Sequence, residues 1–212
     1  MYRTYVSRAA LGRLPEYLRT LKELPAESVP YISATTISKM LNLGEVQVRK
    51  DLAAVSGEGK PKLGYETARL IDKLEEALGC GQQTPAVLVG AGKLGRALLK
   101  YRGFDLYGLR ISAAFDSDEE ALRAADGAVV LPMSEFRRYC KKHRIKLGII
   151  TVGADAAQDV CDLMVGCGIE GIWNFAPRKL EVPGGVIVQN EKLALSLAHL
   201  KFQLSIQDQE DT

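Results

Sequence analysis

A glycine-rich turn carries the residues best suited to chemistry in this sequence. Gly90, Gly92 and Gly95 are spaced as G-x-G-x-x-G, after the apolar run "AVLV" and at the start of a helical pattern. The first glycine of this motif permits a tight turn, the second lets the backbone approach a pyrophosphate, and the third lets the helix pack close to the strand. The N–H groups at the helix start then attract the phosphates. The residues expected to hold a dinucleotide are Gly90, Ala91, Gly92, Lys93, Leu94, Gly95 and Arg96.

An acid at the end of the next apolar run specifies the ligand further. Asp116 lies 21 residues after Gly95 and follows "ISAAF". A carboxylate there accepts hydrogen bonds from the ribose hydroxyls and repels a 2′-phosphate. The expected cofactor is therefore NADH or NAD⁺ rather than the phosphorylated form.

The sequence shows no side chain placed for hydride-transfer chemistry. A dehydrogenase needs a proton donor or acceptor beside the nicotinamide. The two histidines, His143 and His199, lie in a cationic surface-like run and in the last helical pattern, and no tyrosine is followed by lysine four residues later. We therefore expect a cofactor-binding protein that is not an enzyme and has no catalytic residues. The alternative is an NAD-dependent oxidoreductase with an accessory helical domain.

A second stretch has the side chains of a helix that reads DNA. On a helical wheel, "EVQVRKDLAAV" (45–55) turns Val48, Leu52 and Val55 inward and its amide, basic and small residues, Ala53 and Ala54 included, outward. Such residues can contact adenine, guanine, phosphates and thymine methyl groups in a major groove. The preceding "ISKMLNLG" supplies the supporting helix and turn of a helix-turn-helix. A small helical domain with a solvated charged face is the alternative. The expected DNA contacts are Val46, Gln47, Arg49 and Lys50, with Lys60 and Lys62 on the wing-like hairpin "SGEGKPKLGY" (56–65).

The elements that must position these residues change character midway along the chain. Helical patterns cover 14–24, 33–41, 45–55 and 66–78, and a polar linker covers 79–85. Short apolar runs then alternate with helical patterns, at 86–90, 111–115, 127–131, 147–152, 171–175 and 185–189. This alternation predicts a parallel sheet covered on both faces. The expected fold is α/β: a winged helix-turn-helix domain in 1–79, a Rossmann-type domain in 80–190, and an amphipathic helix with a polar tail in 191–212. That helix carries one apolar stripe, formed by Leu193, Leu197, Leu200 and Leu204.

Composition is consistent with this organisation and excludes several classes. Residues 1–65 carry ten Lys/Arg against six Asp/Glu, whereas residues 66–212 carry 18 against 20, an excess too small to indicate nucleic acid by itself. No apolar run approaches the ~20 residues that span a bilayer, and the N-terminus has no secretory signal pattern. We expect a cytoplasmic protein without a membrane partner. Four cysteines without paired spacing or nearby histidines predict reduced thiols, partly buried on helices, and no metal site.

Four separated motifs resemble the Rex redox-sensing transcriptional repressors, over about residues 5–205. They are "QVRKDL", the wing ending in "GY", "GAGKLG" followed by Tyr101, and "NFAP…LEVP" (174–183). The resemblance implies a homodimer whose final helix is exchanged with the partner subunit. It also implies that NADH releases the protein from palindromic double-stranded operator DNA while NAD⁺ permits binding, at genes of fermentation, respiration and NADH reoxidation.

The resemblance also implies roles for individual residues. Gln47, Arg49, Lys50, Lys60 and Lys62 fall on the family's DNA-contacting positions, and Asp116 falls at the adenine ribose. The cofactor is lined by Thr151, Val152 and Gly153, where the family usually has Thr-Val-Pro, so that Gly153 is a departure.

A switch near the nicotinamide is implied in the same way. In the family, a tyrosine at the position of Tyr101 and an aspartate near the start of the last helix compete for an arginine of the first helix. That arginine matches Arg19 here, and the aspartate position holds Lys192. Because a lysine would repel Arg19, we expect Lys192 to turn outward and either Glu191 or Tyr101 alone to engage Arg19.

Overall fold

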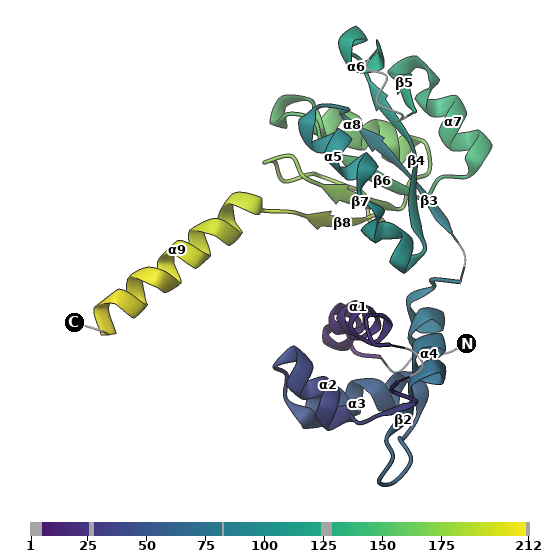
Figure 1. Cartoon of the computed structure of the whole chain (residues 1–212). Helices are drawn as coiled ribbons and strands as arrows, with labels where there is room; N and C mark the ends of the chain where they lie inside the picture. Colours follow the sequence, from purple (N-terminus) through teal and green to yellow (C-terminus); the bar gives the residue numbers. More distant parts are fainter. Residues whose placement is uncertain (1–5, 26–27, 82, 124–128, 211–212) are drawn as a thin grey trace. The chain divides into compact units, whose positions relative to one another are not determined.

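Short capping side chains determine where the first helices begin. In the computed structural model, Ser7 Oγ accepts a hydrogen bond from the Ala10 N–H (3.1 Å), and Ser33 Oγ accepts one from the Thr36 N–H (3.0 Å). Each bond satisfies a donor that has no partner inside its own helix. The N-terminal elements are α1 (Arg8–Lys22), β1 (Tyr31–Ile32), α2 (Ala34–Leu41), α3 (Glu45–Ser56), β2 (Tyr65–Glu66) and α4 (Thr67–Leu78) (Figure 1).

The structure describes residues 6–25, 28–81, 83–123 and 129–210. They divide into two units. The first unit comprises the chain up to Gln83 together with Arg102–Leu109, and the second comprises Thr84–Tyr101 and the chain from Arg110 onward. Because the segment 102–109 returns to the first unit, the backbone passes between the units three times. Within that segment, Tyr107 packs against the apolar core of the first unit.

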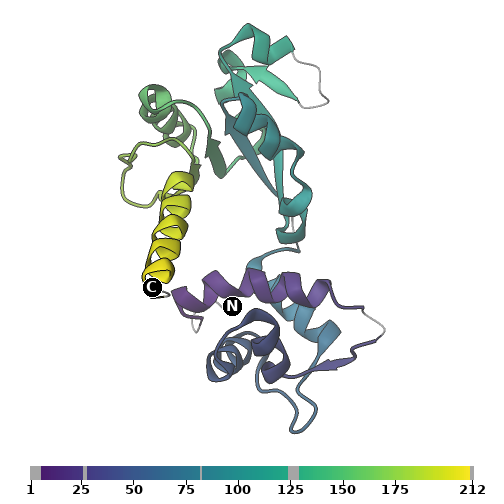
Figure 2. The ribbon, with the colours of Figure 1, turned by 60° about the vertical axis from the view of Figure 1, so that its left-hand side comes forward.

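One apolar cluster holds the first unit together. All four of its helices and both short strands contribute to this cluster. The predicted inner stripe of α1 is present, since Leu14, Leu18 and Leu21 are all buried. Burying one such side chain contributes roughly 1.5–3 kcal/mol. Helix α1, in purple in Figure 2, packs against α4.

The first helix differs from the predicted range 14–24. It begins six residues earlier, at Arg8, ends at Lys22, and contains Pro15. A proline inside a helix removes one backbone hydrogen bond and is common at a helix start, which is why the sequence pattern places the start too late. The Ser7 cap sets the true start.

The wing is a hairpin between α3 and β2. Strands β1 and β2 pair antiparallel, with Ile32 opposite Tyr65. Gly64 has φ +84°, and a Cβ there would lie 2.3 Å from the Ile32 carbonyl oxygen. Only glycine can therefore close the wing against β1.

The second unit is built on a parallel sheet, as predicted. Its strands within the described ranges are β3 (Thr84–Val89), β4 (Leu109–Asp116), β5 (Val130–Pro132), β6 (Leu147–Ile150), β7 (Gly171–Asn174) and β8 (Ile187–Asn190), in the order β5-β4-β3-β6-β7-β8. Gly127 and Ala128 of the expected strand 127–131 lie outside the described residues. Strand order reverses between β3 and β6, and ligands of such sheets bind at this switch point, beyond the carboxyl ends of the strands.

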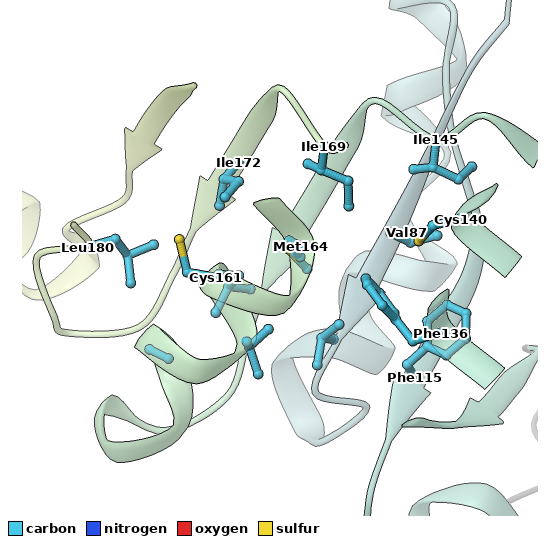
Figure 3. Packing of buried hydrophobic residues seen from close by; sticks show 14 of the residues in the cluster. Val87, Phe115, Phe136, Cys140, Ile145, Cys161, Met164, Ile169, Ile172 and Leu180 are labelled. Atoms are coloured by element: carbon cyan, nitrogen blue, oxygen red, sulfur yellow. The ribbon is translucent and has the colours of Figure 1, made fainter. Parts of the chain in front are cut away.

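Helices cover both faces of the sheet. They are α5 (Lys93–Lys100), α6 (Glu119–Arg123), α7 (Phe136–His143) and α8 (Ala154–Gly166), with 3-10 turns η1 (Arg102–Tyr107) and η2 (Met133–Glu135). On one face, Val87 packs with Phe136 of α7 and Met164 of α8 (Figure 3). On the other face, Leu88 packs with Leu98 of α5. The alternation of neighbouring strand residues between two cores is the expected period of two.

The C-terminal helix α9 (Leu193–Glu210) is exposed along its length. Every side chain from Lys192 to Gln207 is solvent exposed. The predicted leucine stripe exists, but Leu195, Phe202 and Ile206 form a second apolar stripe on the opposite side. The helix is therefore apolar on two faces, and the expectation of a helix with one apolar face is wrong. Across the described ranges, no helix combines the length and hydropathy that a bilayer crossing requires.

Candidate functional site

Glycine stands at each of the three loop positions for a different physical reason. Gly90 has φ +104°, and a Cβ there would lie 2.8 Å from the Thr151 carbonyl carbon. A Cβ on Gly95 would lie 2.0 Å from the Gly90 carbonyl oxygen. A Cβ on Gly92, in contrast, would meet nothing within 4 Å. Gly90 and Gly95 are therefore required by packing within the protein, whereas Gly92 borders the open space that a phosphate would enter.

The start of α5 is open to an anion. Gly92 is its N-cap and provides no side-chain hydrogen bond to the first turn, so N–H groups there are available to phosphate oxygens. Lys93 and Leu94 are exposed beside this turn. The Arg96 guanidinium, which we expected near the cofactor, donates from Nη2 to the Ala121 carbonyl oxygen at 2.8 Å.

Asp116, the acid predicted to bind the ribose, lies at the edge of the same loop. Asp116 Oδ2 accepts a hydrogen bond from the Ala91 N–H at 2.6 Å, and its Oδ1 accepts one from the Asp118 N–H at 2.9 Å. These bonds fix the carboxylate, and each oxygen retains acceptor capacity for a hydroxyl. The loop and Asp116 therefore form one preorganised surface.

The end of β6 closes the other side of the loop. Thr151 Oγ1 donates to the Gly90 carbonyl oxygen at 2.7 Å, and the Thr151 N–H donates to the Val89 carbonyl oxygen at 2.9 Å. Thr151 thus holds the glycine turn as well as lying beside the site, a role that the sequence pattern does not predict. Val152 would be 2.9 Å from a Cβ on Gly90, and Gly153 is the exposed N-cap of α8 with φ −64°.

Helix α3 presents the predicted face. Val46 is 67% exposed, and Gln47, Arg49 and Lys50 are exposed as well, whereas Val48 and Leu52 are fully buried. Arg49 pairs with Glu45 one turn earlier. The residues Ala53 and Ala54 were expected to face outward but are half-buried, because α3 contacts both α2 and α4.

Asp51 is a buried charged residue of α3 that the sequence analysis missed. It is 5% exposed, and its carboxylate accepts from Arg13 Nε (2.8 Å), Arg13 Nη2 (2.9 Å) and the Tyr17 hydroxyl (2.8 Å). The hydrogen bonds to Asp51 raise the pKa of Arg13, and burial raises the pKa of Tyr17 to about 12. An aspartate on the inner stripe of a helix is the signal, since buried charges are almost always paired. This cluster ties α1 to α3.

The wing lysines stand on a tight turn. The Lys60 N–H donates to the Gly64 carbonyl oxygen (2.8 Å), and the Gly64 N–H donates to the Lys60 carbonyl oxygen (2.9 Å). The Lys60 ammonium lies 5.6 Å from the centre of the Tyr31 ring, within cation–π range. Lys62, with φ +66°, is exposed at the tip.

The predicted switch residues fall in different parts of the chain. Arg19, in the first unit, is exposed and lies 3.9 Å from Glu16. Tyr101, in the second unit, ends α5 and is 61% exposed. Glu191 Oε1 accepts from the Trp173 indole N–H at 2.7 Å, and Lys192 is exposed.

The cysteines are free thiols. Cys140 and Cys161 are buried, and Cys80 and Cys167 are half-buried. Burial raises the pKa of Cys140 to about 12. Among the residues that the structure describes, no three His, Cys, Asp or Glu side chains form a group that could hold a metal ion.

Comparison with known proteins gives two family matches, one in each half of the chain. Residues 5–53 match the family described as "Putative DNA-binding protein N-terminus", and residues 81–178 match "CoA binding domain". The redox-sensing transcriptional repressor Rex of Treponema denticola is 41% identical over 197 residues, which are 92% of this chain and 94% of that protein. The chain belongs to the Rex family. The resemblance predicted from its motifs is thereby confirmed.

Further Rex proteins cover nearly the whole chain. Rex of Bacteroides fragilis is 36% identical over 97% of this chain and 94% of its own length. The crystal structure of RSP in complex with NAD⁺ and operator DNA has a TM-score of 0.88 and 31% identity, covering 99% of this chain and 97% of that one. RSP in complex with NADH has a TM-score of 0.85 at the same identity, covering 99% of both chains. RSP is itself described as a Rex-family repressor, and the predicted fold class is confirmed by these structures.

Proposed function

We propose that this chain is an NADH-responsive transcriptional repressor. It binds operator DNA through α3 and the wing, and NADH bound at the loop of Gly90, Gly92 and Gly95 releases it. The observation that supports the proposal is that one chain presents both surfaces: a glycine loop whose backbone is hydrogen-bonded to Asp116, and an exposed helix with amide and basic side chains on a separate unit. RSP, its structural relative, has been crystallised with NAD⁺ and operator DNA and with NADH.

Release by NADH is the measurement that tests this function. The full-length protein should enrich a palindromic duplex from a random pool, and NADH should dissociate the complex in a mobility-shift assay at concentrations at which NAD⁺ does not. Reciprocity requires operator DNA to weaken NADH binding by the same factor by which NADH weakens DNA binding, at one salt concentration. Unequal factors would exclude a single shared equilibrium.

The enzymatic alternative has its own readout. An NAD-dependent oxidoreductase would change the absorbance at 340 nm with an alcohol or hydroxy-acid substrate, whereas a pure sensor leaves NADH unchanged. We propose the sensor, in the cytoplasm and with no metal, because the Rex relatives are regulators by name. Its targets would be genes of fermentation, respiration and NADH reoxidation.

The active form is proposed to be a homodimer, with α9 exchanged between subunits. The exposed helix α9 supports this proposal, because its apolar residues lie on two faces. Each face can be removed from water only by packing against another protein surface.

The switch is proposed to use Arg19 and Tyr101. Because Glu191 already accepts a hydrogen bond from Trp173, we favour Tyr101 alone as the group that engages Arg19, with Lys192 facing solvent. Arg19→Ala and Tyr101→Phe should then change the NADH concentration at half release strongly, and Glu191→Ala only mildly. Lys192→Asp should shift that midpoint by restoring an acid. The switch is excluded here if neither Lys192→Asp nor Tyr101→Phe moves the midpoint.

A further inference from the structure

A run of cations on and after α7 belongs to neither of the two surfaces described above. Residues 137–146 contain six Lys/Arg and no Asp/Glu, whereas the rest of residues 66–212 contains 12 Lys/Arg against 20 Asp/Glu. This part of the chain is therefore acidic apart from one concentrated basic segment. All six cationic side chains are solvent exposed; they are Arg137, Arg138, Lys141, Lys142, Arg144 and Lys146.

Two of these six cations are paired with acids inside the protein. Arg138 Nη2 lies 2.9 Å from Glu135 Oε2, and Lys146 pairs with Glu170. The other four form no ion pair with any residue that the structure describes; they are Arg137, Lys141, Lys142 and Arg144. These four residues form the α7 basic patch.

Helix stability explains only part of this patch. The helix dipole favours cations in the last turn of α7, where Lys141 and Lys142 lie, and disfavours them in the first turn. The first turn contains Arg137 and no acid. Arg144 follows the helix with φ +50°, a position at which glycine or asparagine is more usual. The two ends of the patch are therefore not what helix stability alone selects.

The core beneath α7 holds the patch in a fixed geometry. Phe136 and Cys140 are buried on the inner side of the helix, and the Phe136 ring lies 4.9 Å from the ring of Phe115 (Figure 3). Lys141 follows Arg137 by four residues, which is about 6 Å along the helix axis. Cations on successive turns therefore face solvent together, and no large apolar side chain of α7 is exposed.

This chemistry fits a polymer of negative charges better than a bilayer or a small anion. A helix that binds a membrane surface inserts apolar side chains, whereas α7 buries its apolar residues in the protein core. A single phosphate can meet one turn of the helix, but the patch extends over two turns. Duplex DNA carries one charge about every 3.4 Å along each strand, and Lys and Arg bind these phosphates independently of sequence. Because the chain is proposed to bind DNA, duplex DNA is the favoured polyanion.

We propose that the α7 basic patch is a second, sequence-independent binding site for the phosphate backbone of duplex DNA. It lies in a different unit from α3, and it includes no residue of the glycine loop. NADH should therefore leave the patch intact, so that a repressor released from its operator keeps a weak affinity for other DNA. Only the choice of DNA as the polyanion rests on the proposed function.

The test uses the full-length protein and a fluorescent duplex that contains no operator. Binding is followed by anisotropy over a series of salt concentrations, with and without saturating NADH. In Lys141→Gln/Lys142→Gln, the affinity should fall roughly 10- to 50-fold at about 100 mM salt, and the slope of log affinity against log salt should decrease by about two. Both changes should be the same with and without NADH.

A matched pair of lysines controls for the loss of net charge. Lys179 and Lys201 are exposed in the same unit and lie outside the patch. Lys179→Gln/Lys201→Gln should change the duplex affinity by less than about twofold, since distant exposed charges are screened. The affinity for NADH should equal that of the wild type in both double variants.

Arg144→Asn tests the patch without altering α7 itself. Asparagine tolerates the left-handed conformation of this position, so the thermal unfolding midpoint should not fall. The slope against log salt should nevertheless decrease by about one.

The inference is overturned if both patch variants bind the non-operator duplex as the wild type does, or if they lose no more affinity than the control pair. A loss that is present only without NADH would contradict a site that NADH leaves intact. Retained duplex binding together with lost binding to phosphatidylglycerol vesicles or to polyglutamate would assign the patch to a membrane or to an acidic protein instead. Failure of NADH to release the wild type from its operator would remove the proposed function, and this measurement, which uses no operator, would still stand.

Discussion

Asp51 shows how a single buried carboxylate can position the face of α3 that is proposed to bind DNA. Its two oxygens receive three donors from α1, and they thereby hold α3 at a set distance from that helix. Removing the carboxylate would leave Arg13 without its partner, a change that costs about 3 kcal/mol at buried pairs. The geometry of the exposed face of α3 therefore depends on a residue that does not reach its surface.

Tyr17 makes the stability of the first unit sensitive to alkaline pH. Burial raises its pKa to about 12, whereas an unfolded tyrosine titrates near pH ~10. The folded state holds the proton more tightly, so this contribution is complete below pH ~10 and is lost as the pH rises towards 12. Tyr17→Phe should be about 1 kcal/mol less stable at pH 8. It should lose less stability than the wild type between pH 9 and 11.5.

Urea unfolding followed by circular dichroism measures that difference. Tyr31→Phe is the control, because Tyr31 is an exposed tyrosine in the same unit. It should retain the wild-type dependence on pH. Identical pH dependence in all three proteins would contradict the assignment to Tyr17.

Asp116 should determine both the affinity for NADH and the preference for NADH over NADPH. Charge-assisted hydrogen bonds contribute about 1.5–3 kcal/mol each, so Asp116→Ala should weaken NADH binding by roughly 10- to 100-fold. The variant should stay on operator DNA at NADH concentrations that release the wild type. Isothermal titration with NADH and NADPH measures this, with Asp118→Ala as a matched carboxylate control. An unchanged ratio of NADH to NADPH affinity in Asp116→Ala would argue against the ribose assignment.

The basic residues of the first unit should separate into two kinds of contact. Arg49→Ala or Lys50→Ala should cost about 1–3 kcal/mol of operator affinity and leave NADH binding unchanged. Lys62→Ala, at the tip of the wing, should weaken all sequences alike and reduce the slope of log affinity against log salt by about one. Binding measured at four salt concentrations gives both quantities. Full affinity in the Arg49/Lys50 double variant would remove α3 as the recognition helix.

At the scale of elements, the two loops at the switch point offer a matched pair of glycines. Gly153 has φ −64°, and a Cβ there meets nothing within 4 Å. Gly153→Pro should therefore stabilise the protein by about 0.4–1 kcal/mol, because proline reduces the conformational entropy of the unfolded chain. Gly90→Ala should destabilise it, because of φ +104° and the 2.8 Å approach to Thr151. Differential scanning calorimetry should show the two shifts with opposite signs, and a loss of stability in Gly153→Pro would contradict this account.

Periodicity in the sequence predicts most of the helices and strands, because each has to bury a face. The parallel sheet, the helix of 33–41, the third helix from Glu45 and the end of α4 at Gly79 all lie where apolar spacing and glycine place them. The features that depend on contacts distant in sequence could not be predicted. The Arg13–Asp51 pair joins residues 38 apart, and the Thr151 bond to Gly90 joins residues 61 apart. A pattern within one segment contains no information about either partner.

For the whole molecule, α9 should be the element that holds the proposed dimer together. Its exposed apolar residues lie on two faces, so it can be buried between two surfaces at once. Leu197→Lys and Phe202→Lys, one on each face, should each shift sedimentation from dimer to monomer and weaken operator binding. Lys201→Glu, an exposed change between them, should leave the dimer intact. A wild type that sediments as a monomer at micromolar concentration would contradict the exchanged helix.

The return of residues 102–109 to the first unit limits how this protein can be recombined. A gene fusion that joins residues 1–83 to a different sensor would discard Tyr107, which packs against the first unit's core. A fusion with one junction therefore transfers the first unit without the segment that contains Tyr107. Chimeric repressors from this chain would need to carry a second, separate piece of sequence, and the same requirement restricts the recombination events that evolution can use to give this sensor a new DNA-binding module.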